Sequence, residues 1–195
     1  PLYIACQGGH VDVVRLLLAR EGIQINRGDG EGRTPLWIAC RKNRVEVVKL
    51  LLGARYSADV NYADNDGFTP LYVACDYNHV EVVKILLTVF TIQINEAAPN
   101  GWTPLALACA RGHFQLVQVL LSLHPRPIHV NQAVESGATP LSLACANGHV
   151  EVVKLLLDRE EIHVNQAVES GATPLSLACQ NGQVEVVKLL LAREG

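Results

Sequence analysis

The feature that most constrains the fold is a pattern of residues that returns along the whole chain. One copy, at 64–87, reads DNDGFTPLYVACDYNHVEVVKILL. The proline of its T-P-L motif recurs at intervals of 34 to 36 residues, at Pro1, Pro35, Pro70, Pro104, Pro140 and Pro174. A fixed period of this length indicates a solenoid, in which each unit is stable only when it packs on its neighbours. We predict one array over 1–195, with repeats at about 1–28, 29–63, 64–97, 98–133, 134–167 and 168–195.

Each repeat is expected to form two short helices. Thr69 suits a helix cap, because its hydroxyl can accept a hydrogen bond from a free backbone N–H. Pro70 suits the first helical position, where a backbone N–H would have no partner within the helix. A helix is therefore predicted to begin at Pro70, and Asn78 stands where helices commonly stop in a left-handed conformation. The following run at 80–87, VEVVKILL, is interrupted by only one Glu and one Lys. Most of the circumference of this second helix must then be covered by neighbouring repeats.

Composition limits the classes of partner. Hydrophobic residues make up 49% of the 195 residues, charged residues 18%, and the formal net charge is -3. This charge gives no reason to expect a nucleic-acid partner. No apolar run approaches the roughly 18 residues that a membrane span needs, and no signal peptide opens the chain, so we expect no membrane partner.

The cysteines occupy one repeated position, five residues after each proline: Cys6, Cys40, Cys75, Cys109, Cys145 and Cys179. Packed helices lie farther apart than a disulfide allows, so we expect free thiols and a cytoplasmic or other reducing intracellular compartment. Four of these cysteines precede a His by four residues, which is a possible two-ligand metal spacing. Half-sites spread along a rod supply no third or fourth ligand. We therefore expect no metal, and a His that tethers the turn between helices.

These motifs resemble the ankyrin repeat. The resemblance rests on T-P-L followed by A-C, then Gly or Asn, V-E-V-V-K-L-L-L and V-N, and it covers nearly the whole chain. It implies an all-α, ankyrin-type helical solenoid of stacked helix–turn–helix repeats, with hairpin-like fingers and a curved, concave face. It also implies that partners are held on the concave face and the finger tips.

Two departures from the family pattern stand out. The aspartate that starts a finger is present as Asp29 and Asp64, but its equivalents are Ala98, Val134 and Val168. We therefore do not expect the usual capping hydrogen bond in the last three fingers. The connector at 122–130 is the longest, and Pro125 and Pro127 predict that it forms a stiff loop.

Positions that vary between repeats cannot be required by the framework, so they are candidates for partner contact. The residue two after each proline reads Tyr3, Trp37, Tyr72, Ala106, Ser142 and Ser176. The residue two before it reads Arg33, Phe68, Trp102, Ala138 and Ala172. Large residues thus lie in repeats 1 to 4, and aromatics with Arg are what interface hot spots favour. The predicted partner-binding residues are Tyr3, Arg33, Trp37, Arg41, Phe68, Tyr72, Asp76, Tyr77, Trp102 and Arg111.

Two alternatives remain open for these residues. The Trp and Tyr side chains would instead fill grooves between adjacent first helices, as packing residues. The basic cluster of Arg33, Arg41, Lys42 and Arg44 is either a solvated surface or a contact for an acidic or phosphorylated partner.

The pattern argues against catalysis, since the His and Glu residues repeat with the scaffold and no phosphate-binding loop is present. We expect a non-enzymatic, monomeric module that binds a protein or peptide on the concave face of repeats 1 to 4. No cofactor and no small-molecule substrate are expected. A structural spacer or scaffold array is the alternative. The resemblance also allows the target-recognition domain of a larger regulator, such as a ubiquitin-ligase adaptor or a pathogen effector in the host cytosol. Because the chain begins inside a repeat, we expect a fragment of a longer protein, with its first and last repeats incomplete.

Overall fold

The computed structural model describes residues 1–56, 58–122 and 127–194. These residues form twelve α-helices and no β-strand. Contacts divide the chain into two compact units, Pro1–Pro99 and Asn100–Gly195. The predicted all-α fold of stacked helix pairs is confirmed.

The first helix of each repeat begins where the T-P-L motif predicts. These helices are α1 (Leu2–Gly8), α3 (Pro35–Arg41), α5 (Pro70–Asp76), α7 (Pro104–Ala110), α9 (Pro140–Ala146) and α11 (Pro174–Gln180). The hydroxyl of Thr69 accepts a hydrogen bond from the N–H of Tyr72 at 3.1 Å, and the same threonine cap precedes α3, α7, α9 and α11. Asn78 has a φ of 56°, in the left-handed region, as predicted.

The second helices bury a smaller share of their residues than the first helices do. They are α2 (Val11–Leu18), α4 (Val45–Leu52), α6 (Val80–Leu87), α8 (Phe114–Leu121), α10 (Val150–Leu157) and α12 (Val184–Glu194). In α6, Val82, Val83 and Leu86 are fully buried. The exposed residues of α6 are Glu81 and Lys84. Nζ of Lys84 lies 3.8 Å from Oε2 of Glu81. The two residues that interrupt the apolar run of this helix are therefore the ones exposed to solvent.

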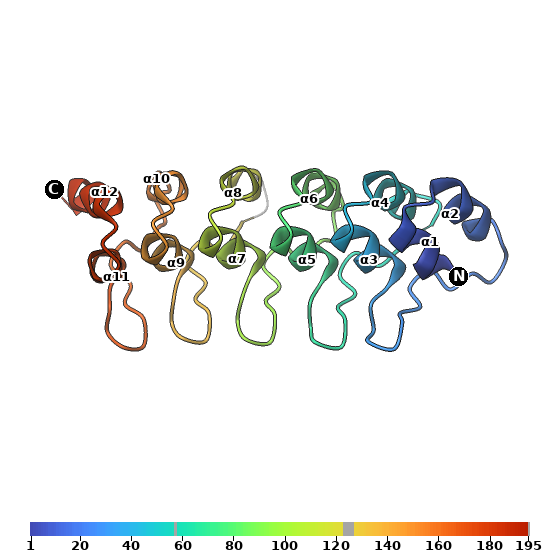
Figure 1. Cartoon of the computed structure of the whole chain (residues 1–195), viewed down its shortest axis with the longest axis horizontal. Coiled ribbons are helices and arrows are strands. Elements are labelled where there is room, and N and C mark those ends of the chain that lie inside the picture. Colours follow the sequence, from blue (N-terminus) through green and yellow to red (C-terminus); the bar gives the residue numbers. More distant parts are fainter. Residues whose placement is uncertain (57, 123–126, 195) are drawn as a thin grey trace. The chain divides into compact units, whose positions relative to one another are not determined.

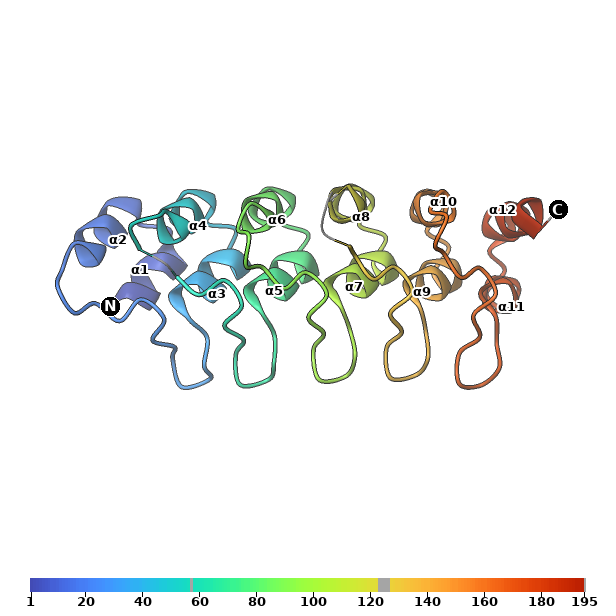
Figure 2. The same cartoon turned by 180° about the vertical axis from the view of Figure 1, so that it is seen from behind.

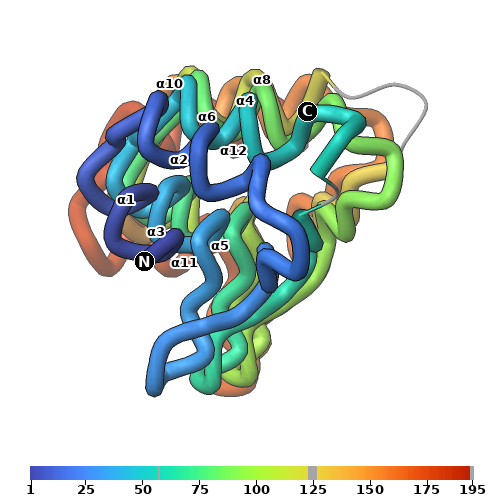
Figure 3. Tube along the Cα trace, turned by 90° about the vertical axis from the view of Figure 1, so that its right-hand side faces the viewer, coloured from blue at the N-terminus to red at the C-terminus, as the bar shows by residue number. Residues whose placement is uncertain are grey.

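Each unit consists of two layers of helices. In the first unit, α1, α3 and α5 lie side by side in one layer, and α2, α4 and α6 form the other (Figures 1 and 2). In the second unit, the layers are α7, α9, α11 and α8, α10, α12. The finger before α3 extends away from both layers of the first unit (Figure 3). Apolar side chains between the layers form most of the core, and in the second unit the finger residues Val134 and Ala138 are also buried.

The repeated His and Cys residues serve this stacking. Nε2 of His79 lies 3.1 Å from the carbonyl oxygen of Arg41 in the preceding repeat, and His149 makes the same contact with Ala110 at 2.9 Å. The six cysteines are free, and all except Cys179 are buried. Burial raises the pKa of these buried thiols, which favours their unreactive protonated form. In the described part of the chain, no three metal-ligating side chains gather.

Two further predictions concern the connectors and the membrane. Residues 123–126 of the Pro125 connector lie outside the described residues, so its stiffness stays a prediction. Among residues 1–56, 58–122 and 127–194, no helix has the length and apolar character that crossing a bilayer requires.

Candidate functional site

An open groove of about 380 Å³ runs over α3, α5 and the two fingers that precede them. We call it the arginine–aromatic groove. Its lining residues are Glu31, Arg33, Trp37, Arg41, Asp64, Asp66, Phe68, Tyr72, Val73, Asp76 and Tyr77. Seven of the ten predicted contact residues are among them. These residues come together because equivalent positions of adjacent repeats lie side by side when α3 packs on α5.

Trp37 forms the floor of the groove. Its side chain is only 5% exposed, and its Nε1–H donates a hydrogen bond to the carbonyl oxygen of Phe68 at 2.9 Å. This bond joins two repeats, and burying the indole while its N–H is paired stabilises their contact. For Trp37 the structure therefore favours the packing alternative, with a part in binding confined to shaping the groove.

Phe68 and Tyr72 offer a more accessible aromatic surface. Their ring centroids lie 4.9 Å apart with an interplanar angle of 27°, which is a stacked pair. Both side chains are half-buried. Stacking fixes the two rings relative to each other, so little side-chain entropy remains to be lost when another group packs against them.

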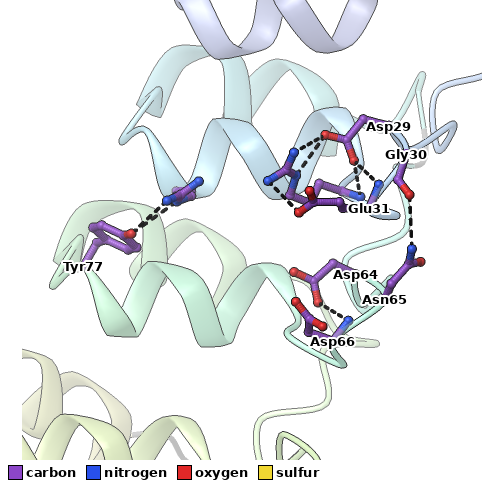
Figure 4. A network of polar contacts seen from close by, with 9 residues as sticks. Asp29, Gly30, Glu31, Asp64, Asn65, Asp66 and Tyr77 are labelled. Atoms are coloured by element: carbon purple, nitrogen blue, oxygen red, sulfur yellow. Dashed lines mark hydrogen bonds and ion pairs between the residues drawn. The ribbon is translucent and has the colours of Figure 1, made fainter.

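Arg41 and Tyr77 lie at the helix end of the groove. Nε and Nη2 of Arg41 donate to the Tyr77 hydroxyl at 3.2 and 3.1 Å, as the dashed lines at Tyr77 show (Figure 4). The guanidinium carbon also lies 5.7 Å from the Trp37 ring centroid and 5.5 Å from that of Tyr77. Tyr77 is 47% exposed. This end therefore presents an accessible phenol beside a cation that is held in place.

At the finger end, Asp29 accepts most of its hydrogen bonds from its own repeat. Its Oδ1 accepts from the N–H of Glu31 at 3.0 Å and of Arg33 at 3.1 Å, and its Oδ2 accepts from Nε and Nη2 of Arg33 at 2.9 and 2.7 Å (Figure 4). Burial alone would raise the pKa of Asp29, but the hydrogen bonds from Arg33 and the backbone lower this pKa to about 2. Arg33 also pairs with Glu31 at 3.1 Å.

The equivalent aspartate of the next finger, Asp64, is satisfied only in part. Its Oδ1 accepts from the N–H of Asp66 at 3.2 Å and of Phe68 at 2.8 Å. Burial raises the pKa of Asp64, against the lowering effect of those backbone hydrogen bonds. Among the residues that the structure describes, no ion pair joins Asp64 or Asp66 to a cation.

The two fingers are held side by side by Asn65. Its backbone N–H donates to the carbonyl oxygen of Glu31 at 2.9 Å, and its Nδ2 donates to that of Gly30 at 3.3 Å (Figure 4). Both carboxylate-bearing fingers therefore face the same groove. Sequence reasoning missed Glu31, Asp64, Asp66 and Val73 as lining residues. The signal for Asp64 was present, because the residue four positions after it is Phe where the preceding repeat has Arg.

The fingers that start at Val134 and Val168 keep their backbone turn without an aspartate. In the finger that starts at Val134, the backbone N–H of Val134 donates to Ala138 at 3.0 Å and that of Gly137 donates to Val134 at 2.8 Å. The aspartate side chain thus adds capping bonds to a turn that the backbone already forms.

The other three predicted contact residues do not line this groove. Tyr3 lines a separate pocket of about 560 Å³ beside α1, and its hydroxyl donates to Asp29. Trp102 packs in the second unit against Ala106, Val134 and Ala138. Arg111 is exposed at the end of α7.

The second unit contains a counterpart groove of about 390 Å³ over α9, α11 and their fingers. We call it the small-residue groove. It is lined by Ser136, Ala138, Ser142, Leu143, Ala146, Val168, Glu169, Ser170 and Leu177. Most of these occupy the repeat positions that line the arginine–aromatic groove.

A family model described as ankyrin repeats (3 copies) matches residues 1–64, 54–132 and 123–195. The chain belongs to the ankyrin repeat family. An ankyrin repeat domain from Acinetobacter baumannii AYE is similar in structure, with a TM-score of 0.89 and 28% identity over 100% of this chain and 97% of that one. A second ankyrin repeat protein has a TM-score of 0.88 and 28% identity over 98% and 96%. No curated protein matches the chain. Ankyrin repeats generally mediate protein–protein interactions and are generally not enzymes.

Proposed function

We propose that the arginine–aromatic groove of the first unit binds a protein or peptide segment. One observation carries this proposal. The same framework forms two grooves of similar volume, and only one is lined with arginine and aromatic side chains. Because the small-residue groove folds without them, a groove of this size does not require arginine or aromatic side chains, although Trp37 also packs between repeats in its own place.

The groove has the chemistry of an interface hot spot. Tyr and Arg carry much of the binding energy in protein interfaces, because they combine apolar area with directed hydrogen bonds. Here Tyr77 is accessible, Arg41 is held against two rings, and the Phe68–Tyr72 stack is preorganised. A segment that covers these side chains would bury aromatic area without having to order it first.

The proposed role is recognition without catalysis. The chain has six thiols, and burial raises the pKa of five of them. A thiol in this state supplies little thiolate at neutral pH.

The test uses a variant that takes its residues from the equivalent positions of repeats 5 and 6. Arg41→Ala, Tyr72→Ser and Tyr77→Asn together install the residues found at the equivalent positions Ala146, Ser176 and Asn181. Peptides are selected from a random display library on the wild-type chain, and their affinities are measured by fluorescence anisotropy. We expect the triple variant to bind them about 100-fold more weakly.

The matched control is Lys49→Ala, which removes an exposed cation from α4 outside the groove. It should bind the peptides as the wild type does. Circular dichroism and thermal unfolding establish that each variant is folded. Equal affinity of folded triple variant and wild type would overturn the proposal, as would a library that yields no binder, which is what a structural spacer predicts.

A further inference from the structure

Two consecutive repeats share one residue and differ at two others among three equivalent positions. The finger and first helix of repeat 2 carry Asp29, Arg33 and Trp37, and those of repeat 3 carry Asp64, Phe68 and Tyr72. In repeat 2 the arginine contacts both of the other side chains. Arg33 donates twice to Oδ2 of Asp29, at 2.9 and 2.7 Å, and its guanidinium carbon lies 5.9 Å from the Trp37 ring centroid.

In repeat 3 the corresponding set lacks its cation. Repeat 3 keeps the aspartate, and Tyr72 supplies an aromatic ring at the position of Trp37. Phe68, however, occupies the position of Arg33. Asp64 is half-buried, and its Oδ1 accepts hydrogen bonds from the backbone N–H groups of Asp66 and Phe68. A carboxylate that has lost part of its hydration without gaining a cation is destabilised, and a cation from outside would relieve this.

The surrounding charges also favour a positively charged ligand. Asp29, Glu31, Asp64 and Asp66 bring four carboxylates to the two fingers, against the single guanidinium of Arg33 (Figure 4). Arg33 is already paired with Asp29 and Glu31, and Arg44 donates to the Gln7 carbonyl oxygen at 3.0 Å. The basic cluster is thus partly engaged within the chain, and the finger end of the groove attracts a cation rather than an acidic or phosphorylated group.

We propose that the groove recognises an arginine side chain of its protein partner, whose guanidinium pairs with Asp64 and lies against the Phe68–Tyr72 stack. Repeat 2 supplies the template, because Arg33 makes both contacts with Asp29 and Trp37 inside the same chain. The inference rests on the proposed function, since it names the chemistry of the segment that the groove binds.

Arginine fits better than lysine for a physical reason. The guanidinium is planar, so it can donate two parallel hydrogen bonds to one carboxylate while its face packs on an aromatic ring. A lysine ammonium is more strongly hydrated and cannot make this bidentate contact. The stacked rings offer a flat surface beside Asp64, which is what a guanidinium requires.

The test is a double-mutant cycle on peptides selected as above. We expect an arginine at one shared position of the peptides that lose affinity for the triple groove variant. Replacing this arginine by citrulline keeps its shape and removes its charge, and Asp64→Asn keeps the acceptor for the Phe68 N–H. Each change alone should weaken binding about tenfold or more. Both changes together should weaken it no more than either alone, because they remove the same contact.

Two further variants serve as controls. Asp12→Asn makes the same chemical change on an exposed residue of α2, and it should leave affinity unchanged. Phe68→Arg reproduces the repeat 2 arrangement within repeat 3. Its guanidinium should pair with Asp64, lower the pKa of that carboxyl as measured by carbon NMR, and block the arginine peptides.

The possible failures are distinguishable. Peptides that depend on the groove but share no arginine, or independent additive effects of citrulline and Asp64→Asn, overturn the arginine inference and leave the proposed function standing. Peptides that bind the folded triple variant as well as the wild type overturn the proposed function. A library without binders overturns both.

Discussion

The arginine–aromatic groove and the small-residue groove have nearly the same volume, about 380 and 390 Å³, yet their linings differ in chemistry. Trp37 and Arg41 in the first correspond to Ser142 and Ala146 in the second. Groove volume therefore follows from the framework, whereas the chemistry of the lining follows from a few substituted positions. A repeat architecture separates these two properties because each repeat packs on its neighbours through the same residues.

The largest difference should appear in stability. Replacing Trp37 by serine, its counterpart at Ser142, empties a buried site and leaves the carbonyl oxygen of Phe68 without its indole donor. We expect the free energy of unfolding to fall by about 3–5 kcal/mol, measured by urea titration. In contrast, Ser142→Ala removes only the bond from its hydroxyl to the Thr139 carbonyl oxygen at 2.9 Å and should cost less than about 1.5 kcal/mol. Equal losses of stability in the two variants would contradict the expectation that Trp37 contributes more to packing than Ser142 does.

A smaller effect is expected at the fingers. Asp29→Asn removes the ion pair with Arg33, which the Val134 finger never had. Because this pair is partly exposed, the loss should not exceed about 1 kcal/mol at neutral pH. The pKa of Asp29 is lowered from 3.8 to about 2 in the folded chain. Its stabilising contribution is therefore complete above about pH 4 and disappears as the pH falls toward 2. Urea titrations across this range should show that slope in the wild type and its reduction in Asp29→Asn.

The smallest effect, and one of opposite sign, is expected at the equivalent position of the next repeat. Burial raises the pKa of Asp64, and Asp66 raises it further while Arg33 lowers it. A raised carboxyl pKa means that the folded state holds its proton more tightly, so stability declines as the pH rises above the ordinary value of 3.8. Asp64→Asn should remove this decline and leave stability at pH 7 equal or slightly higher, within about 0.5 kcal/mol. A clear loss of stability at pH 7 would mean that Asp64 has a partner within the chain.

Local patterns explain why much of the fold was predictable. A threonine cap, a proline at the first helical position and a residue with left-handed φ act over a few residues, so Thr69, Pro70 and Asn78 mark one helix without reference to the rest of the chain. The site was predictable in part for the same reason. Variable positions were visible as a departure from the repeat, and seven of the ten chosen residues line one groove.

What sequence reasoning did not resolve at the site depends on contacts between repeats. Sequence reasoning grouped Trp37 with Tyr77, although the first is 5% exposed and the second 47%. It treated Asp64 as a capping residue alone, whereas the structure also places its carboxylate in the groove. The exposure of a side chain depends on which side chain of the adjacent repeat lies opposite it. The sequence of a single repeat does not contain that information.

By itself, the sequence determined the repeat, the helix boundaries, the buried second-helix residues and the list of variable positions, because all of these follow from short-range spacing. The tertiary structure decided which variable residues are packing and which are surface, and that Arg33 pairs within the chain while Asp64 does not pair with a cation among the described residues. The physical reason is the stacking of the solenoid. Residues such as Trp37 and Phe68, 31 positions apart, become direct partners only when one repeat packs on the next.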